Sequence, residues 1–263
     1  MNDFAPHVTK KRFGQHFLHD KNILRNIVEY VAPQPGEGIV EIGPGEGALT
    51  FPLLRAAGRL TAIELDRDLI EPLRARAAAI GELSVVNRDV LEVDFSALAR
   101  EAGVDAIRLV GNLPYNISTP ILFHCLDHAG AIRDMHFMLQ KEVVDRMAAG
   151  PGSKTYGRLS VMLQLRCSVE PLFDVPPGAF SPPPKVDSAV VRLVPLPPER
   201  LPQADFAAID RVVRAAFGQR RKTLSNALRG VAEADNLAAA GIDPRARAEQ
   251  LAPEQFVALA RIL

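Results

Sequence analysis

The chain has 263 residues, 48% of them hydrophobic, so it can form one large domain, or a large and a small one, with a sizeable core. It carries 31 basic and 31 acidic residues, and this zero net charge does not by itself indicate a nucleic-acid partner. Its two cysteines, Cys125 and Cys167, are too few for a disulfide framework and show no metal-binding spacing. The polar, basic N-terminus lacks the apolar run of a signal peptide, and no stretch is long enough to span a membrane. We therefore expect a cytoplasmic protein with reduced thiols, no metal and no membrane association.

Short apolar runs alternate with helical patterns through the first two-thirds of the chain. The runs expected to be buried strands are residues 38–43, 59–65, 83–89 and 107–112. This alternation is typical of βαβ units, so the sequence predicts an α/β fold with a parallel sheet. Residues 160–173 and 188–196 fit either further strands or a helix followed by a strand, and they could add an antiparallel edge.

Two proline-rich stretches indicate boundaries. Residues 175–187 (VPPGAFSPPPKVD) predict a stiff loop, and residues 195–203 (PLPPERLPQ) predict a linker. Beyond the linker the chain is rich in alanine, leucine and arginine and has a helical pattern to its end. We therefore expect an α/β domain over residues 1–197 and a small helical domain over residues 198–263.

A glycine-rich motif, VEIGPGEG, covers residues 40–47 at the end of the first expected strand. Its glycines allow a tight turn and a close approach to a ligand, which in such a sheet binds at the carboxyl ends of the strands. The second strand ends at Glu64, 21 residues after Gly43, which is near the spacing of a carboxylate that binds ribose hydroxyls. The third strand ends at Asp89. Each feature alone also fits an ordinary turn with surface acids, but together they predict a nucleoside site.

Two nucleoside cofactors fit this outline, NAD(P) and S-adenosylmethionine. NAD(P) sites prefer the spacing GxGxxG, whereas this motif has GxGxG preceded by Glu41. An acid before the loop suits a cofactor that carries an ammonium rather than a pyrophosphate. S-adenosylmethionine has an ammonium and a sulfonium, and Asp89 suits its adenine amino group. The sequence therefore favours S-adenosylmethionine.

The fourth strand leads directly into GNLPY, residues 111–115. The Asn112 side-chain oxygen and the Leu113 carbonyl can each accept one hydrogen of an amino group on a flat ring, and Pro114 restrains Leu113 to an extended backbone. Tyr115 can stack on that ring. Two such acceptors favour a pyramidal, more nucleophilic nitrogen, so positioning would supply most of the catalysis. A plain strand-to-turn transition is the alternative interpretation.

Basic residues cluster twice along this neutral chain. Between residues 211 and 229 there are six basic residues and no acid, and between residues 7 and 25 there are five against one acid. Such clusters can bind phosphate, but they also fit solvated surfaces, and charge alone does not decide between these.

Several segments, in order and spanning nearly the whole chain, resemble those of the bacterial small-subunit ribosomal RNA adenine N6-dimethyltransferases. They are KRFGQHFL (11–18), VEIGPGEGALT (40–50), IELDRDL (63–69), GNLPYNISTPIL (111–122), MHFMLQKEV (135–143), YGRLSVMLQ (156–164), FSPPPKVDSAVVRL (180–193) and FGQRRKTLSNAL (217–228). The resemblance implies a Rossmann-like class I S-adenosylmethionine-dependent methyltransferase sheet with a small all-helical, RNA-binding C-terminal domain. It also implies N6,N6-dimethylation of two adjacent adenosines in the 3′-terminal hairpin of 16S rRNA, in the immature small subunit late in assembly. We expect the enzyme to act as a monomer.

The resemblance also assigns site residues. The cofactor contacts it implies are His16, Leu18, Gly43, Glu64, Asp89 and Asn112. His16 stands where some family members have asparagine. The target adenine would lie against Asn112, Leu113 and Tyr115, with Phe180 as a second stacking aromatic. The rRNA phosphates would contact Arg220, Arg221 and Lys222, and from the other side Lys10, Lys11 and Arg12.

Two other functions remain open from the sequence. One is a resistance methyltransferase that modifies one adenosine of 23S rRNA, although such enzymes often carry NIPY and a different C-terminal region. The other is a ribosome-assembly factor whose binding to an immature subunit matters more than its catalysis.

Overall fold

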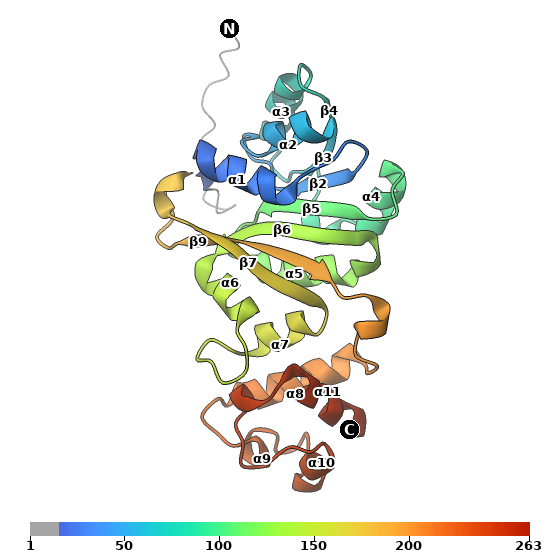
Figure 1. Cartoon of the computed structure of the whole chain (residues 1–263), viewed down its shortest axis with the longest axis vertical. Helices are drawn as coiled ribbons and strands as arrows, with labels where there is room; N and C mark the ends of the chain where they lie inside the picture. The colour runs from blue at the N-terminus through green and yellow to red at the C-terminus, as the bar shows by residue number, and fades with distance from the viewer. Residues whose placement is uncertain (1–15) are drawn as a thin grey trace. The chain divides into compact units, whose positions relative to one another are not determined.

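Figure 1 shows a computed structural model of the protein, which describes residues 16–263. The chain forms two compact units. Of the described residues, one unit comprises 16–144 together with Glu170–Pro195, and the other comprises Asp145–Val169 together with Leu196–Leu263.

A seven-stranded sheet forms the core of the first unit in the described part of the chain, in the order β4-β3-β2-β5-β6-β9-β7. In this order, the strands β4, β3, β2, β5 and β6 are each parallel to their neighbours within that group, and β9 is antiparallel to β6. The strands are β2 (Gly38–Ile42), β3 (Arg59–Ile63), β4 (Glu82–Val86), β5 (Ile107–Asn112), β6 (Ile132–Gln140), β7 (Cys167–Val175) and β9 (Ser188–Pro195). Two short strands, β1 (Phe17–Leu18) and β8 (Phe180–Ser181), pair separately as an antiparallel ribbon.

Amphipathic helices connect these strands. They are α1 (Lys21–Val31), α2 (Thr50–Ala57), α3 (Ile70–Ala77), α4 (Phe95–Ala102) and α5 (Ser118–Asp127), and α6 (Lys141–Ala148) continues into the second unit. The Asp94 side chain accepts hydrogen bonds from the first turn of α4, and Gly103 ends that helix in a left-handed conformation. Helix α1 is capped in the same way by Asp20 and buries Leu24, Ile27 and Val31, which share one face.

The four strands expected from the first half of the sequence are present as β2 to β5, and each ends within three residues of the expected position. Residues 160–173 form a helix and then a strand, α7 (Arg158–Gln164) followed by β7, which was one of the two alternatives. Strand β6 and the β1–β8 ribbon were not expected. Residues Arg133, Asp134 and His136 interrupt the apolar pattern of β6 although the strand is mostly buried.

The sheet places a crevice at the carboxyl ends of β2 and β5. The chain leaves β2 toward β3 and β4 on one side and later returns to β5 on the other, so the strand order reverses between β2 and β5. Open α/β sheets bind ligands at such a point. Here Ile42 lies beside Gly111, and a Cβ atom on Gly111 would approach the Ile42 carbonyl oxygen to 2.6 Å. Only glycine fits this strand position.

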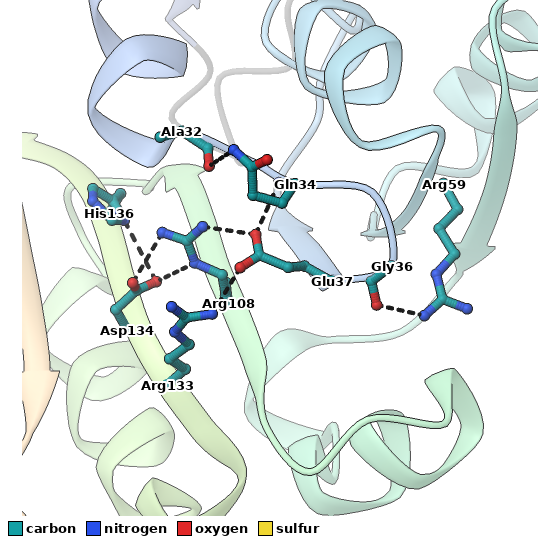
Figure 2. A network of polar contacts seen from close by, with 9 residues as sticks. All are labelled: Ala32, Gln34, Gly36, Glu37, Arg59, Arg108, Arg133, Asp134 and His136. Atoms are coloured by element: carbon teal, nitrogen blue, oxygen red, sulfur yellow. Dashed lines mark hydrogen bonds and ion pairs between the residues drawn. The ribbon is translucent and has the colours of Figure 1, made fainter.

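The opposite end of the sheet holds a network of ion pairs, shown in Figure 2. Arg108 on β5 donates two hydrogen bonds of 2.9 Å to the Asp134 carboxylate on β6 and a third, of 2.8 Å, to Glu37. Arg133 donates to the other oxygen of Glu37 at 2.7 Å. His136 lies beside this network with 2% of its surface exposed, and neither of its ring nitrogens has a hydrogen-bond partner. The network joins β5, β6 and the residue before β2.

The second unit is mainly helical. It contains α7, α8 (Phe206–Gly218), α9 (Leu224–Ala227), α10 (Ala234–Ala239) and α11 (Pro253–Ile262). It also contains residues 145–169, which fall inside the first domain expected from the sequence. The reason is long-range packing: Tyr156 is fully buried, donates a hydrogen bond to the Leu251 carbonyl and contacts the Phe217 ring. A proline-rich linker marks where the chain crosses between units but cannot reveal such contacts.

Within residues 16–263, every helix is too short or too polar to cross a membrane. The same residues contain no group of three or more histidine, cysteine or acidic side chains arranged to hold a metal ion.

Candidate active site

A pocket of about 390 Å³ lies at the carboxyl ends of β2, β3 and β5. Eight of the residues assigned to the site from the sequence line it: His16, Leu18, Gly43, Glu64, Asp89, Asn112, Leu113 and Tyr115. They come from five separate segments of the chain, and the sheet topology brings these segments together.

The glycine-rich loop forms one wall of the pocket. Gly43, Gly45 and Gly47 all have positive φ angles, between 55° and 86°. A Cβ atom on Gly45 would also approach the Phe17 ring to 2.9 Å. The loop therefore needs glycine both for its backbone conformation and for its contact with β1.

Glu64 fixes the loop to the end of β3. One oxygen of its carboxylate accepts the Gly45 backbone N–H at 3.2 Å, and the other accepts the Asp66 N–H at 2.8 Å. Burial raises the pKa of Glu64, and these two hydrogen bonds oppose that rise. A carboxylate oxygen can accept more than one hydrogen bond, so Glu64 can also accept ribose hydroxyls.

Asp89 lies at the adjacent position, after β4. Its Oδ1 accepts the Leu91 N–H at 3.0 Å and begins the short 3₁₀ helix Val90–Glu92. Within the described chain its Oδ2 makes no hydrogen bond, so this atom can accept one from an adenine amino group.

Glu41 is the most isolated acid of the pocket. It is the penultimate residue of β2, is 2% exposed, and its Oε2 has no hydrogen-bond partner. Burial, with a further contribution from the charge of Glu64, raises the pKa of Glu41 to about 8. An unpaired buried carboxyl is costly unless a ligand satisfies it. The residues present therefore fit S-adenosylmethionine, because its ammonium and sulfonium are cations and its ribose and adenine suit Glu64 and Asp89.

Asn112 has a fixed orientation at the end of β5. Its side-chain nitrogen donates to the His16 carbonyl at 3.0 Å, and this hydrogen bond leaves Oδ1 as an acceptor with no partner among the described residues. The next residue, Leu113, donates its backbone N–H to the Met138 carbonyl on β6 at 3.1 Å. Both residues are thus held by neighbouring segments before any substrate binds.

Tyr115 is held by two interactions that the sequence did not reveal. Its hydroxyl lies 2.7 Å from the Ser188 hydroxyl, at the start of β9. Its ring stacks on the His16 ring, with 5.7 Å between ring centroids and 25° between ring planes. Nδ1 of His16 in turn donates to the Pro182 carbonyl at 2.8 Å. Ser188 comes close to Tyr115 only when the sheet has formed, so no local sequence signal could have identified this hydrogen bond.

Phe180 does not line the pocket. It pairs with Leu18 in the β1–β8 ribbon, is 2% exposed and packs in the hydrophobic core. The structure thus shows an anchoring role for this ring, and stacking on a target base remains a prediction that requires the ring to leave the core.

The basic residues assigned to RNA binding differ in their surroundings. Lys10, Lys11 and Arg12 lie outside the described residues. Arg220 donates to the carbonyls of Lys154 and Tyr156, at 2.9 and 3.1 Å, and its guanidinium lies 3.5 Å from the Glu249 carboxylate. Arg221 and Lys222 are exposed. All three side chains are exposed, but Arg220 is held by these contacts within the second unit, whereas Arg221 and Lys222 make no such side-chain contact among the described residues.

Comparison with known proteins assigns the chain to a family. A family model described as ribosomal RNA adenine dimethylase matches residues 7–263. The chain belongs to this family. A similar curated protein, "Ribosomal RNA small subunit methyltransferase A" of Xanthomonas campestris pv. campestris (strain 8004), is 63% identical over 262 residues, which cover 100% of this chain and 99% of the relative.

Two solved structures share the fold of this adenine dimethylase. A dimethyladenosine transferase from Plasmodium falciparum has a TM-score of 0.80 and 27% identity, with 93% of this chain and 96% of that one covered. The 23S rRNA methyltransferase ErmE has a TM-score of 0.71 and 28% identity, with 94% and 99% covered. The expected family, the Rossmann-like class I methyltransferase fold and the choice of S-adenosylmethionine as methyl donor are thereby confirmed.

The protein is therefore an enzyme that dimethylates adenine in ribosomal RNA. Its pocket offers acidic groups along one side and the Asn112–Tyr115 turn at the other. This arrangement can hold a cationic nucleoside next to a flat base that carries an amino group.

Proposed function

We propose that the enzyme dimethylates N6 of two adjacent adenosines in the 3′-terminal hairpin of 16S rRNA. It acts as a monomer in the cytoplasm, on immature small subunits late in their assembly. The 63% identity to a protein named for the small ribosomal subunit, over the whole chain, supports this choice of substrate.

The observation that carries the chemistry is the orientation of Asn112. Because its amide nitrogen is engaged by His16, its Oδ1 is left to accept one hydrogen of an adenine amino group, and the Leu113 carbonyl accepts the other. S-adenosylmethionine supplies an electrophilic methyl group. In the first transfer, holding both amino hydrogens in this way favours a pyramidal nitrogen, whose lone pair is less delocalised into the ring and can point at the methyl group.

No side chain is required as a strong base in this scheme. Nitrogen becomes cationic when it gains the methyl group, and such a cation loses its proton readily to water. In our proposal, six residues hold the cofactor: His16, Leu18, Gly43, Glu64, Asp89 and Asn112. Tyr115 stacks on the adenine, and Phe180 can contribute a second ring only after it rotates.

RNA binding is assigned to exposed basic residues. Arg221 and Lys222 contact phosphates, together with Lys10, Lys11 and Arg12, whereas Arg220 contributes mainly through its hydrogen bonds inside the second unit. Phosphate contacts position the RNA, while the pocket selects adenine. The adenine must leave its stack to reach the pocket, so loop nucleotides are the expected targets.

The test uses S-adenosylmethionine with a labelled methyl group and three substrates: small subunits without the dimethyl marks, mature small subunits and large subunits. We expect label only in the unmodified small-subunit RNA, as dimethyladenosine at two neighbouring positions. Label in large-subunit RNA would instead favour the 23S-type activity of ErmE. Firm binding to immature small subunits without any label would favour an assembly factor and contradict the role of Asn112.

A further inference from the structure

Glu41 differs from Glu64 and Asp89 in accepting no backbone hydrogen bond from the described residues. Glu64 accepts two backbone hydrogen bonds, and Asp89 accepts one. Glu41 is 2% exposed, leaves Oε2 without a partner, and forms no ion pair within the described residues. Glu41 nevertheless lines the pocket. A charged carboxylate in this position would be unfavourable in the empty protein.

Among residues 16–263, the groups around Glu41 do not supply a counter-charge. The Glu64 carboxylate, from β3, adds like charge, and the Thr50 side chain, from α2, lowers the pKa of Glu41 by less than burial raises it. Asn112, from β5, is neutral. The other ionisable residues that line the pocket are His16, Glu46, Arg88, Asp89 and Tyr115. Of these, Arg88 and Glu46 are exposed to solvent, where their charges are screened.

We propose that Glu41 holds a proton while the pocket is empty and releases it when S-adenosylmethionine binds. The proposal rests on the assignment of this pocket to the cofactor. Binding brings a cation next to the buried carboxyl, and an adjacent opposite charge favours the ionised form. The proton leaves Glu41 for the solvent, so the pocket exchanges a proton for the cationic ligand.

This exchange makes cofactor affinity depend on pH. Because the pKa of Glu41 is about 8 in the protein without ligand, its carboxyl is mostly protonated at neutral pH. Each binding event then releases close to one proton, and affinity rises by about tenfold per pH unit below pH 7 and levels off as the pH passes through 8. A nucleoside without a cation should bind without this dependence.

The test is isothermal titration calorimetry of the full-length protein with S-adenosylmethionine in buffers of different ionisation enthalpy. At neutral pH we expect the observed enthalpy to change with the buffer by an amount that corresponds to nearly one released proton. The neutral ligand 5′-methylthioadenosine should bind with little release. Equal release with both ligands, or no buffer dependence with S-adenosylmethionine, would overturn the proposal without the need for any variant.

Two variants locate the proton. Glu41→Gln should abolish the release and flatten the pH dependence of the dissociation constant. The control Glu46→Gln changes an exposed carboxyl that borders the same pocket and should keep both effects. Unchanged release in Glu41→Gln would exclude Glu41 as the source. If S-adenosylmethionine did not bind at all, the cofactor site itself would be refuted, which is a different result from binding without proton release.

Discussion

The Tyr115 hydroxyl lies 2.7 Å from the Ser188 hydroxyl and so connects the turn after β5 to the first residue of β9. Ser188 is fully buried, so this hydrogen bond satisfies a group that has no access to water. The two strands are not neighbours, because β6 lies between them. The Tyr115 ring at the pocket is therefore held by a hydrogen bond that spans the intervening strand β6.

This hydrogen bond separates two roles of Tyr115. Tyr115→Phe keeps the ring but leaves the buried Ser188 hydroxyl without this partner, at a cost of about 1–3 kcal/mol. Tyr115→Ala also removes base stacking, worth roughly 1–3 kcal/mol per base, so we expect its kcat/KM on unmethylated small-subunit RNA to fall by a further factor of about ten to a hundred. Ser188→Ala should resemble Tyr115→Phe. Equal losses of activity in the Phe and Ala variants would argue against stacking.

Asn112→Ala should abolish methyl transfer while only weakening cofactor binding. The substitution removes the Oδ1 acceptor and the hydrogen bond to His16. Single-turnover transfer and equilibrium binding of S-adenosylmethionine, measured on the same sample, distinguish the two effects. Normal turnover in this variant would refute the positioning of the adenine amino group.

Arg221 and Lys222 should contribute to RNA affinity, and Arg220 to stability. Replacing both Arg221 and Lys222 by Gln should reduce the slope of log affinity against log salt by roughly 0.7–0.9 for each phosphate that is no longer neutralised. Arg220→Gln removes the hydrogen bonds to two carbonyls and the ion pair with Glu249, so its main effect should be a lower melting temperature. An unchanged salt slope in the double variant would place the RNA on another surface.

Asp134→Ala should destabilise the protein strongly. Arg108 and Asp134 expose 8% and 4% of their side chains, and removing Asp134 takes two of three hydrogen bonds from the buried Arg108 guanidinium and leaves Glu37 as its acidic partner among the described residues, at a cost of about 1–3 kcal/mol. Arg133→Gln is the matched control because Arg133 is 63% exposed, and its replacement should cost less than about 1 kcal/mol. Denaturant unfolding measures both. Similar costs for the two variants would contradict the importance of burial.

His136 should make the protein sensitive to acid. Burial lowers the pKa of His136 from 6.5 to about 4, and the positive charges of Arg108 and Arg192 act in the same direction, while Asp134 opposes them. Between about pH 4 and pH 6.5, His136 is therefore mostly protonated in the unfolded chain and mostly neutral in the folded protein. Its contribution to stability is complete above about pH 6.5 and falls toward pH 4 by about 1.4 kcal/mol per pH unit.

Unfolding free energies at pH 7 and pH 5 test this dependence. His136→Gln removes the titrating group, so the loss of stability between the two pH values should be smaller than in the wild type. A variant with the same acid sensitivity as the wild type would show that other groups cause it.

The sequence predicts most of the cofactor side of the pocket because its signals are local. Adjacent residues identify a glycine that needs a positive φ angle, such as Gly43. They also identify an acid that directly follows an apolar strand, such as Glu64. Strand β6 was missed because Asp134 and His136 interrupt its apolar pattern. Asp134 is accommodated by Arg108, 26 residues away, and this pairing exists only in the folded sheet.

The adenine side depends more on tertiary structure. Asn112 was identified from its motif, but the partner that orients its amide, the His16 carbonyl, lies 96 residues away. Phe180 lies in a proline-rich loop, where an aromatic more often packs in the core, and only the family resemblance favoured a pocket role for it. Its burial in the β1–β8 ribbon depends on the pairing with Leu18.

Gly111 and Asn112 are adjacent yet constrained for different reasons, and this has a consequence for how such proteins diverge. Gly111 is fixed by the backbone of the neighbouring strand, where even a methyl group would collide with the Ile42 carbonyl. Asn112 is constrained, in the mechanism that we propose, by the reaction that it supports. A descendant that lost methyl transfer but kept its fold would be free to exchange the asparagine and would still retain the glycine. On the proposed role of Asn112, a glycine followed by a residue without a side-chain acceptor would therefore indicate that methyl transfer has been lost.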